Sequence, residues 1–336
     1  MAQTRVYVIA EVGSVHDGSL GNALRLVDAA AECGVDAVKF QTHLAAAETL
    51  PDAPAPAFFR DEPRFAYFER TSFSLDGWRA LKTRCEEKGV AFLSSPFSEE
   101  AVDLLESLAL SRYKIPSGEV TNLPLLDKVA RLGKPVLLSS GMSSWAELDR
   151  AVETIRRHHD RLTVLQCTSA YPCPDEQVGL NVLAEMRERY RLPVGLSDHT
   201  LTPYASLAAV TLGASVIERH FAFSRRMYGS DARHSLEPAE LAELVRGIRS
   251  LETMQAHPVD KASAERFRDL KRVFEKSLVT ARPIAAGSVI ERTMLAVKKP
   301  GTGVPAARLD EVVGKRAARD LAADTLLMPE DVRWDA

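Results

Sequence analysis

The fold of this protein is decided by the stretch Val194-Gly-Leu-Ser-Asp-His-Thr-Leu-Thr-Pro-Tyr-Ala-Ser-Leu-Ala-Ala-Val-Thr-Leu-Gly-Ala-Ser-Val-Ile-Glu-Arg-His220. It begins with a short apolar run at 194–196, continues with a helical pattern over 203–212, and ends with a second apolar run at 215–217. A strand, a helix and a strand in this order are typical of a unit whose two strands pair in parallel. Both apolar runs lead directly into polar residues that can carry chemistry.

The same alternation extends toward the N-terminus. Including the two runs above, the β-rich apolar runs are 6–10, 37–40, 90–93, 113–115, 136–138, 162–165, 194–196 and 215–217. The helical patterns that follow them are 20–33, 75–88, 98–108, 123–132, 145–158, 182–190, 203–212 and 238–254. Eight successive units favour a closed (β/α)8 TIM barrel of about 250 residues over an open doubly wound sheet. The long link after the second run contains the stretch 51–56, rich in Pro and Ala, which we expect to be a loop or lid.

The C-terminal part of the chain has a different pattern. Arg282-Pro-Ile-Ala-Ala-Gly-Ser-Val-Ile-Glu-Arg-Thr-Met-Leu295 aligns with Arg319-Asp-Leu-Ala-Ala-Asp-Thr-Leu-Leu-Met-Pro-Glu-Asp-Val332, 37 positions later. Two copies are too few for a solenoid, and they favour a small β-rich module in which the copies pack on each other. The polar residues between this module and the barrel read as a linker. We therefore predict a barrel over 1–256, a linker over 257–276 and a small domain over 277–336.

Composition limits the classes of partner and compartment. The formal charge of −3 gives no reason to expect nucleic acid or an anionic membrane as a partner. No window approaches the roughly 20 apolar residues of a membrane span, and the N-terminus has no secretory pattern. The four cysteines form no CxxC pair, so neither a zinc knuckle nor a disulfide framework is indicated. We expect a cytoplasmic enzyme.

Polar side chains gather where the predicted strands end, and active sites of barrel enzymes lie at these ends. They are Glu11, Lys39, Gln41, Ser95, Lys114, Ser117, Glu119, Ser139, Ser197, His199, Glu218 and His220. Lysines and serines suit a phosphate or carboxylate group, and Glu11 and Glu119 suit acid/base chemistry. Alternatives remain for each kind: serines also cap helices, and a lysine can form a structural ion pair with Glu11 or Glu119.

His199 and His220 end neighbouring strands, so their side chains can approach each other. Neutral imidazoles suit a divalent transition metal such as manganese, cobalt or zinc. With two protein ligands the ion keeps open positions, which Lewis-acid polarisation of a substrate carbonyl requires. Either histidine could instead be a buried structural residue.

Ten short motifs and one C-terminal motif together resemble the N-acetylneuraminate (sialic acid) synthase family nearly from end to end. The barrel motifs are Ile9-Ala-Glu-Val-Gly13, His16-Asp-Gly-Ser19, Val38-Lys-Phe-Gln-Thr-His43, Ser95-Pro-Phe-Ser98, Tyr113-Lys-Ile-Pro-Ser-Gly-Glu119, Leu138-Ser-Ser-Gly-Met142, Cys167-Thr168, Tyr171-Pro172, Gly195-Leu-Ser-Asp-His-Thr200 and Glu218-Arg-His-Phe221. Lys299-Pro-Gly-Thr-Gly303 resembles the family's antifreeze-like (SAF) domain. This resemblance implies that the protein is a nonulosonic acid synthase with a C-terminal SAF domain.

The resemblance further implies condensation of phosphoenolpyruvate with an acetamido-sugar aldehyde, with carbon–oxygen cleavage of the enol phosphate. It implies that a metal, manganese with magnesium or cobalt as alternatives, is held by His199 and His220. It implies phosphoenolpyruvate contacts from Lys39, Ser95, Lys114, Ser117, Ser139 and Ser197, and sugar contacts from Gln41, Ser169, Tyr171, Asp231 and Lys299. In the family the SAF domain of one subunit covers the partner's site, so a domain-swapped homodimer is expected.

Departures from the family pattern leave the sugar open. The run at Val15 lacks the usual asparagine, Gln166-Cys-Thr-Ser169 replaces a His-Cys-Thr-Asn run, and Lys299 replaces an arginine. N-acetylmannosamine and the diacetamido-trideoxy hexoses that lead to legionaminic or pseudaminic acid are the alternatives.

Three rival functions follow from parts of the sequence. Lys114 could be the nucleophile of a metal-independent Schiff-base aldolase acting on pyruvate-type substrates. The C-terminal module alone would suit a sugar-binding or ice-binding protein. A relative that uses a sugar phosphate and makes a shorter acid is the third, and the tail module speaks against it.

Overall fold

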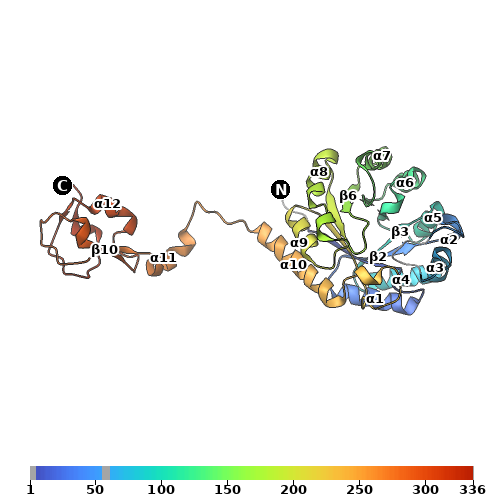
Figure 1. Ribbon diagram of the computed structural model, residues 1–336, viewed down its shortest axis with the longest axis horizontal. Coiled ribbons are helices and arrows are strands. Elements are labelled where there is room, and N and C mark those ends of the chain that lie inside the picture. Colours follow the sequence, from blue (N-terminus) through green and yellow to red (C-terminus); the bar gives the residue numbers. More distant parts are fainter. Residues whose placement is uncertain (1–4, 55–60, 336) are drawn as a thin grey trace. The chain divides into compact units, whose positions relative to one another are not determined.

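The computed structural model describes residues 5–54 and 61–335, and the chain divides into two compact units, Met1–His257 and Pro258–Ala336. The first unit is a barrel of parallel strands enclosed by helices, and the second is a small β-rich unit (Figure 1). The predicted fold class, a TIM barrel followed by a SAF domain, is confirmed.

The barrel strands are β1 (Tyr7–Gly13), β2 (Ala37–Thr42), β3 (Ala91–Pro96), β4 (Tyr113–Ile115), β5 (Val136–Ser139), β6 (Leu162–Cys167), β7 (Val194–Asp198) and β8 (Val216–His220). Their hydrogen-bonded order is β3-β2-β1-β8-β7-β6-β5-β4, and β3 also contacts β4, so the sheet curves round on itself. All the hydrogen-bonded neighbours are parallel, which brings the C-terminal ends of the strands to one rim.

The helices of the barrel cover the outer face of the strands (Figure 1). They are α1 (Leu20–Glu32), α2 (Ala45–Glu48), α3 (Arg64–Thr71), α4 (Leu75–Glu87), α5 (Glu99–Ser107), α6 (Leu123–Arg131), α7 (Trp145–Arg156), α8 (Leu180–Tyr190), α9 (Tyr204–Thr211) and α10 (Pro238–Ala256). Serines do cap some of them: Ser98 caps α5, and Ser144 forms a capping box with Glu147 on α7. The candidate site serines Ser95, Ser139 and Ser197 lie within strands instead, so helix capping does not explain them.

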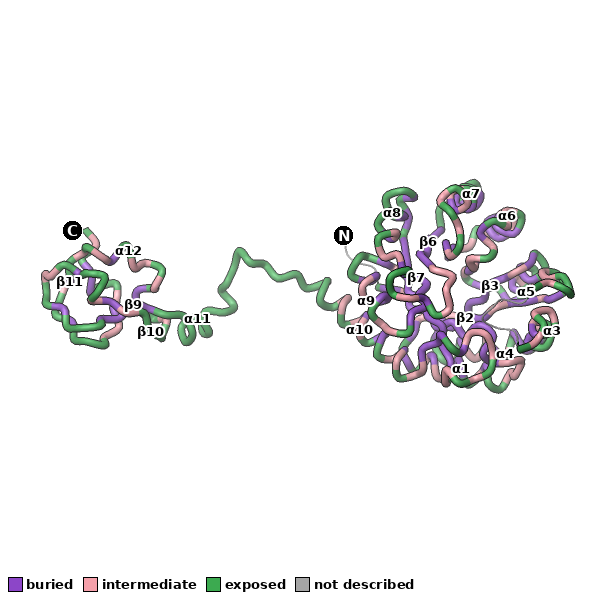
Figure 2. Tube along the Cα trace, viewed as in Figure 1, coloured by how far each residue is buried: buried purple, intermediate pink, exposed green. Residues whose placement is uncertain are grey.

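Two apolar layers hold the barrel together. Inside it, Ile9, Leu93, Leu137 and Leu165 belong to a small buried cluster, and a much larger cluster lies between the strands and the helices. Figure 2 shows this division, with buried strands at the centre and exposed outer turns of the helices. Packing inside the barrel is tight, since a Cβ at Gly195 would lie 2.5 Å from both Leu165 Cδ2 and the Val216 carbonyl oxygen.

Several strands extend further than the apolar runs predicted. For example, β1 continues to Gly13, β3 to Pro96, and β8 to His220. The extra residues include Glu11, Ser95, Glu218 and His220 of the candidate site. Backbone pairing therefore holds those side chains in the sheet, where they are more precisely placed than they would be in loops.

The link after β2 contains two helices, α2 and α3, that the sequence patterns did not predict. Of the stretch 51–56 predicted as a loop, residues 51–54 form a turn and coil, and the rest lies outside the described residues. The helix α3 begins after Pro63, and its Tyr67 is buried.

The second unit contains helices α11 (Arg268–Phe274) and α12 (Leu309–Val312) and strands β9 (Ser277–Thr280), β10 (Leu295–Lys298), β11 (Arg316–Ala317) and β12 (Val332–Arg333). Ile284 and Leu321, equivalent positions of the repeat, exchange two backbone hydrogen bonds of 2.9 and 2.8 Å. Each copy also carries a 3-10 turn before its last strand, Arg292–Met294 and Pro329–Asp331. The copies thus pair about a local pseudo-twofold axis and share one apolar core.

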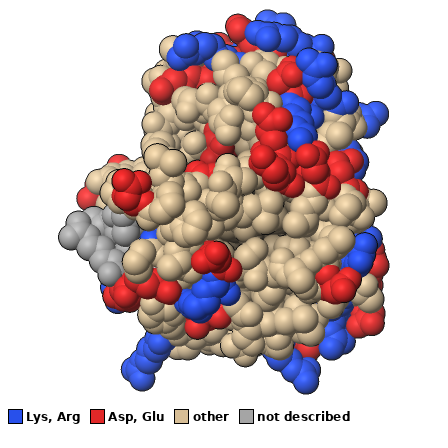
Figure 3. Space-filling view, turned by 90° about the vertical axis from the view of Figure 1, so that its right-hand side faces the viewer, with Lys and Arg blue, Asp and Glu red and all other residues tan. Residues whose placement is uncertain are grey.

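Residues 253–276, which include the predicted linker, are exposed, and part of this segment is the short helix α11 (Figure 2). Side chains of both charge signs occur on the face seen in Figure 3.

None of the helices in the described ranges is long and apolar enough to cross a membrane. The four cysteines are buried and form no disulfide.

Candidate active site

Strand register explains which polar side chains meet at the rim. Glu11 of β1 lies opposite both Lys39 of β2 and His220 of β8. In the same way, Ser197 of β7 lies opposite Glu218 of β8. Residues that are far apart in the chain are therefore brought side by side by the pairing of four strands.

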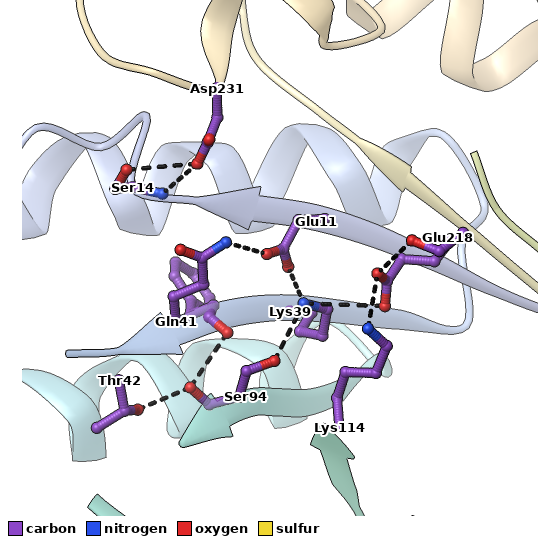
Figure 4. Close-up of polar contacts among 12 residues, drawn as sticks. Glu11, Ser14, Lys39, Gln41, Thr42, Ser94, Lys114, Glu218 and Asp231 are labelled. Carbon is purple, nitrogen blue, oxygen red and sulfur yellow. Dashed lines mark hydrogen bonds and ion pairs between the residues drawn. The ribbon is translucent and has the colours of Figure 1, made fainter. Parts of the chain in front are cut away.

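Four of these side chains form what we call the lysine–glutamate network: Glu11, Lys39, Lys114 and Glu218. Lys39 Nζ lies 2.7 Å from Glu11 Oε2 and 3.8 Å from Glu218 Oε2, and Lys114 Nζ lies 3.2 Å from Glu218 Oε1. Figure 4 shows Lys39 between the two carboxylates. All four side chains are almost completely buried, so two positive and two negative charges balance one another away from water.

The network shifts the pKa of each member. Burial raises the pKa of Glu11 against the opposing effect of Lys39. Burial would also raise the pKa of Glu218, but Lys114 and Lys39 together hold it below its ordinary value. Burial lowers the pKa of Lys114, whereas for Lys39 the two carboxylates outweigh burial and raise the pKa. Glu11 is thus the carboxylate that takes up a proton more readily, and Glu218 is the one that stays ionised.

Serine hydroxyls hydrogen-bond to two members of the network, and two further candidate serines lie at or just after the ends of β4 and β5. Lys39 Nζ donates to Ser95 Oγ at 3.3 Å, and Ser197 Oγ donates to Glu218 Oε1 at 3.0 Å. Ser117 Oγ lies 3.5 Å from Cys167 Sγ. Ser139 Oγ is buried and has no hydrogen-bond partner among the described residues. Hydroxyls and ammonium groups so arranged can receive an anionic group with several oxygens.

The second group at the rim is the histidine cluster: His199, His220 and His234. Ring centroids are 5.3 Å apart for His199–His220, 4.6 Å for His220–His234 and 6.1 Å for His199–His234. One donor atom each from His220, His234 and Asp231 lie within 4.8 Å of one another. All three imidazoles are buried.

The pKa shifts of two of the three imidazoles suit a metal, whereas for His199 the neighbouring Cys167 outweighs burial and raises the pKa. Burial lowers the pKa of His220 well below its ordinary value, with His234 and His199 adding to the effect, and burial lowers the pKa of His234 to about 4. His220 Nδ1 and His234 Nε2 are buried without a hydrogen-bond partner among the described residues. His199 Nδ1 lies 3.0 Å from the Thr168 carbonyl oxygen; if it donates there, Nε2 is the nitrogen free to bind. Neutral, unpaired imidazole nitrogens are what a divalent transition metal needs.

A buried ion pair braces the strand ends that carry two of these histidines. Arg219 Nη1 donates to Asp198 Oδ2 at 2.6 Å, and Nη2 donates to the Thr200 carbonyl oxygen at 2.5 Å. Arg219 also donates to Ser206 Oγ on α9 at 3.3 Å, so it points into the helix layer as its position in the strand predicts. Because Asp198 and Arg219 immediately precede His199 and His220, the pair fixes the backbone next to both rings.

A cavity of about 440 Å³ opens beside the cluster, a size typical of small-molecule sites. Gln41, Ser117, Ser169, Tyr171, His220, Asp231 and His234 are among the residues that line it. Two glycines keep this space open. A Cβ on Gly13 would lie 2.3 Å from Asp231 Oδ2, and one on Gly141 would lie 2.0 Å from Ser117 Oγ.

Another wall of the cavity is aromatic. The His43 ring stacks between Phe68 and Phe97, with ring centroids 3.7 and 4.1 Å away. Both nitrogens of His43 are engaged, Nδ1 with Glu48 at 2.7 Å and Nε2 with Gln41 Oε1 at 3.0 Å. Arg64, Tyr67 and Phe68 of the unpredicted helix α3 also line the cavity.

Two candidate residues are not joined to these groups. Glu119 lies half-buried on a 3-10 helix (Ser117–Glu119), and among the described residues its side chain accepts a hydrogen bond from Asn122 Nδ2 at 2.7 Å. Burial raises its pKa. Lys299 belongs to the second unit, where its Nζ lies 5.0 Å from the centre of the Phe274 ring.

Sequence reasoning missed Glu218 as a partner of both lysines, and missed His234. The signal for Glu218 was its spacing of two from His220, which puts both side chains on one face of β8. The signal for His234 was its spacing of three from Asp231, on a 3-10 helix (Ala232–His234) that follows β8. Lys114 pairs with Glu218 rather than Glu119, because Glu119 lies beyond the end of β4.

Comparisons with known proteins agree on one family. A family profile described as the NeuB family matches residues 26–260, and one for the SAF domain matches residues 275–333. N,N'-diacetyllegionaminic acid synthase of Campylobacter jejuni is 36% identical over 331 residues, which cover 96% of this chain and 99% of that protein. Human N-acetylneuraminate-9-phosphate synthase is 35% identical, over 96% of this chain and 92% of the relative. The crystal structure of N-acetylneuraminic acid synthetase from Leptospira borgpetersenii in complex with citrate gives a TM-score of 0.70 at 29% identity, covering 80% of this chain and 91% of that one.

Proposed function

Because this chain belongs to the NeuB family of nonulosonic acid synthases, we propose that it condenses phosphoenolpyruvate with an acetamido-sugar aldehyde and releases phosphate by carbon–oxygen cleavage. The resemblance seen in the sequence motifs is confirmed by the family profiles and relatives. The observation that carries the proposal is that a buried lysine–glutamate network and a buried histidine cluster, two of whose ring nitrogens have no hydrogen-bond partner among the described residues, lie at one barrel rim.

Phosphoenolpyruvate would bind at the lysine–glutamate network. Its carboxylate and phosphate suit the ammonium groups of Lys39 and Lys114 and the hydroxyls of Ser95, Ser139 and Ser197. Ser139 Oγ is already buried without a partner, so it can donate to the anion at no cost to an existing bond. Ser117, at the cavity wall, would extend this contact toward the sugar.

The bond that forms joins C3 of phosphoenolpyruvate to the aldehyde carbon, and water then adds to C2 while phosphate leaves. The added water leaves only its oxygen behind, as the C2 ketone, and gives up two protons: one goes to the departing phosphate and the other to the new hydroxyl. Glu11 can carry this proton because burial raises its pKa and its carboxylate lies beside Lys39. Glu218 keeps both lysines charged and oriented.

The aldehyde oxygen would lie at the histidine cluster. A divalent metal, for which we propose manganese, supplies Lewis-acid polarisation of that carbonyl when bound there. His199 and His220 would hold it, and the brace from Arg219 to Asp198 keeps their backbone in place. Tyr171 contacts this corner, with its ring centroid 4.5 Å from that of His199.

The rest of the sugar would occupy the 440 Å³ cavity, with Gln41, Ser169 and Asp231 able to bond its hydroxyl or amide groups. The aromatic wall built by Phe68 and Phe97 suits the methyl group of an acetamido substituent. N-acetylmannosamine and the diacetamido-trideoxy hexoses both present such a group.

The test is a product assay. The enzyme is incubated with manganese, phosphoenolpyruvate labelled with ¹⁸O in the bridging C–O–P oxygen, and each acetamido sugar in turn. Carbon–oxygen cleavage sends the label into phosphate, and the product mass identifies the sugar. Label retained in the organic acid, or no phosphate with any sugar, would refute the proposal.

The Schiff-base aldolase is tested by a separate trapping experiment. Burial lowers the pKa of Lys114, which is a property of amine nucleophiles, but its ion pair with Glu218 opposes this shift. Borohydride reduction in the presence of pyruvate should leave Lys114 unlabelled. Covalent labelling of this residue would favour the aldolase.

We further propose that the chain acts as a domain-swapped homodimer, with the SAF unit of one subunit, including Lys299, serving the partner's site. The exposed stretch 258–267 before α11 offers the length for such an exchange. Mixing a full-length His220→Ala variant with a chain ending at Glu275 should restore part of the activity, because mixed dimers pair an intact barrel with an intact SAF unit. No recovery despite confirmed subunit exchange would mean that each SAF unit serves its own barrel or none.

A further inference from the structure

The buried residue His234 is the feature that reaches beyond the site expected from the motifs. Its side chain is 2% exposed, and its Nε2 has no hydrogen-bond partner among the described residues, with Asp231 Oδ1 at 4.0 Å. His220 Nδ1 is likewise buried and unpaired. A buried nitrogen without a partner is costly unless something binds it, and two of them in adjacent rings share one corner of the site.

We propose that His234 is a third imidazole ligand of the divalent metal, which it shares with His199 and His220, with the Asp231 carboxylate at the edge of the same coordination sphere. This inference rests on the proposed function for the presence of the metal. It assigns to His234 a role that the strand-end argument and the motifs do not give it.

Ring spacing supports a common ion. Two imidazoles bound at about 2.1 Å through nitrogen have ring centroids roughly 4.6–5.3 Å apart for angles between right-angled and tetrahedral. The His220–His234 and His199–His220 distances, 4.6 and 5.3 Å, agree with this range. The His199–His234 distance of 6.1 Å is slightly longer, so these two rings would sit at a wider angle.

The position of Asp231 supports a metal site at this corner of the cavity. Its Oδ2 accepts hydrogen bonds from Ser14 N at 3.2 Å and Ser14 Oγ at 3.3 Å, which orients the carboxylate. The donor atoms of His220, Asp231 and His234 lie within 4.8 Å of one another, whereas ligands of one ion lie at most about 4.2 Å apart. The most widely separated donor atoms would therefore have to approach each other by at least about 0.6 Å.

A set of three imidazoles has a consequence for the choice of metal. Nitrogen ligands favour manganese, cobalt and zinc over magnesium, which prefers oxygen ligands and keeps its waters. We therefore expect magnesium to compete poorly at this site.

The experiment measures Mn²⁺ binding to the full chain without phosphoenolpyruvate or sugar. Isothermal titration should show at least a tenfold loss of Mn²⁺ affinity in His234→Gln, and pulsed EPR should show one fewer imidazole nitrogen coupled to the ion than in the wild type. The matched control is His43→Gln: this buried histidine lines the same cavity, but both its ring nitrogens are already engaged. Its imidazole count and Mn²⁺ affinity should equal those of the wild type.

Unchanged affinity and an unchanged imidazole count in His234→Gln would overturn the inference, as would a wild type that binds no Mn²⁺. Displacement of Mn²⁺ by a tenfold excess of Mg²⁺ would also contradict the nitrogen-rich site. Because the binding assay contains no substrate, none of these outcomes bears on carbon–oxygen cleavage, which the ¹⁸O assay decides separately.

Discussion

The lysine–glutamate network and the histidine cluster lie at the same rim but differ in how fully their polar atoms are paired within the protein. In the network, Lys39 and Lys114 each face at least one carboxylate within 3.2 Å. In the cluster, His220 Nδ1 and His234 Nε2 face no hydrogen-bond partner in the described part of the chain. The network is complete as folded, whereas the cluster is complete only when something binds it.

This difference implies opposite responses to mutation. Removing one member of a balanced set of buried charges leaves another charge unpaired, which costs stability as well as binding. Removing a ring whose nitrogen has no partner leaves no such charge behind. Substitutions in the cluster should therefore impair function with little loss of stability, and substitutions in the network should impair both.

The largest effect is expected for His220→Ala. Loss of a metal ligand removes several kcal/mol of transition-state stabilisation, so turnover should fall by roughly 10³-fold or more. The melting temperature without metal should change little. Phosphate release and thermal melts measure the two quantities, and chelation of the wild type should reproduce the loss of turnover. Full wild-type activity in chelator would contradict the metal assignment and remove one side of the comparison.

Glu218→Gln should lower the stability of the fold, because it breaks the ion pairs of the network. The substitution leaves Lys39 and Lys114 with the single carboxylate of Glu11, and breaking a buried ion pair typically costs about 3–5 kcal/mol. A bound anion would offset the excess positive charge, so phosphoenolpyruvate should raise the melting temperature more in this variant than in the wild type. An unchanged melting temperature without ligand would show that the network is not tightly coupled.

The contrast between the two regions also explains how much the sequence could predict. The barrel was predictable because apolar runs and helical patterns repeat through eight units, and the rule that strand ends form the site then located Lys39, Lys114, His199 and His220. Which carboxylate pairs with which lysine depends on strand register, and apolar runs alone do not specify it. The register places Glu218 beside Lys114.

Residues outside the strand ends were harder to find. His234 lies on a 3-10 turn after β8, where no periodic pattern marks it. The cavity-lining helix α3 was missed because Arg64-Phe-Ala-Tyr-Phe-Glu-Arg-Thr71 is rich in aromatic residues of modest helix propensity and follows a proline. In both cases tertiary packing, rather than local pattern, determines the structure.

Lys114→Met tests the binding side of the network at nearly constant volume. It removes a charge-assisted contact to phosphoenolpyruvate, typically worth about 1.5–3 kcal/mol, so affinity should fall roughly 10- to 150-fold. Titration calorimetry with phosphoenolpyruvate measures this change. The control is Lys128→Met, because Lys128 pairs with Asp103 on the outer surface and should leave affinity unchanged. Equal affinities in both variants would place the anion elsewhere.

The smallest effect is expected for Ser139→Ala. This variant tests whether a buried hydroxyl without a partner binds phosphoenolpyruvate. Ser139 Oγ, at the end of β5, is buried and has no partner among the described residues, so in this respect it resembles the two unpaired nitrogens of the cluster. Its loss should leave the free energy of unfolding unchanged or slightly higher. One hydrogen bond from an uncharged donor to anionic phosphoenolpyruvate disappears, worth about 1.5 kcal/mol at the low end for bonds to charged groups, so affinity falls roughly tenfold. Ser94→Ala is the matched control: Ser94 Oγ is equally buried but bonds Thr42 Oγ1 at 2.7 Å and the Phe40 carbonyl oxygen at 3.2 Å. This variant should lose about 1–3 kcal/mol of stability with phosphoenolpyruvate affinity unchanged, because it leaves Thr42 unpaired and touches no ligand. Denaturant unfolding and calorimetry on the pair separate the two roles. Ser139→Ala could instead lower the free energy of unfolding and leave the affinity for phosphoenolpyruvate unchanged. The Ser139 hydroxyl would then stabilise the fold rather than bind the ligand. A buried group without a partner would then not indicate a binding site in this barrel.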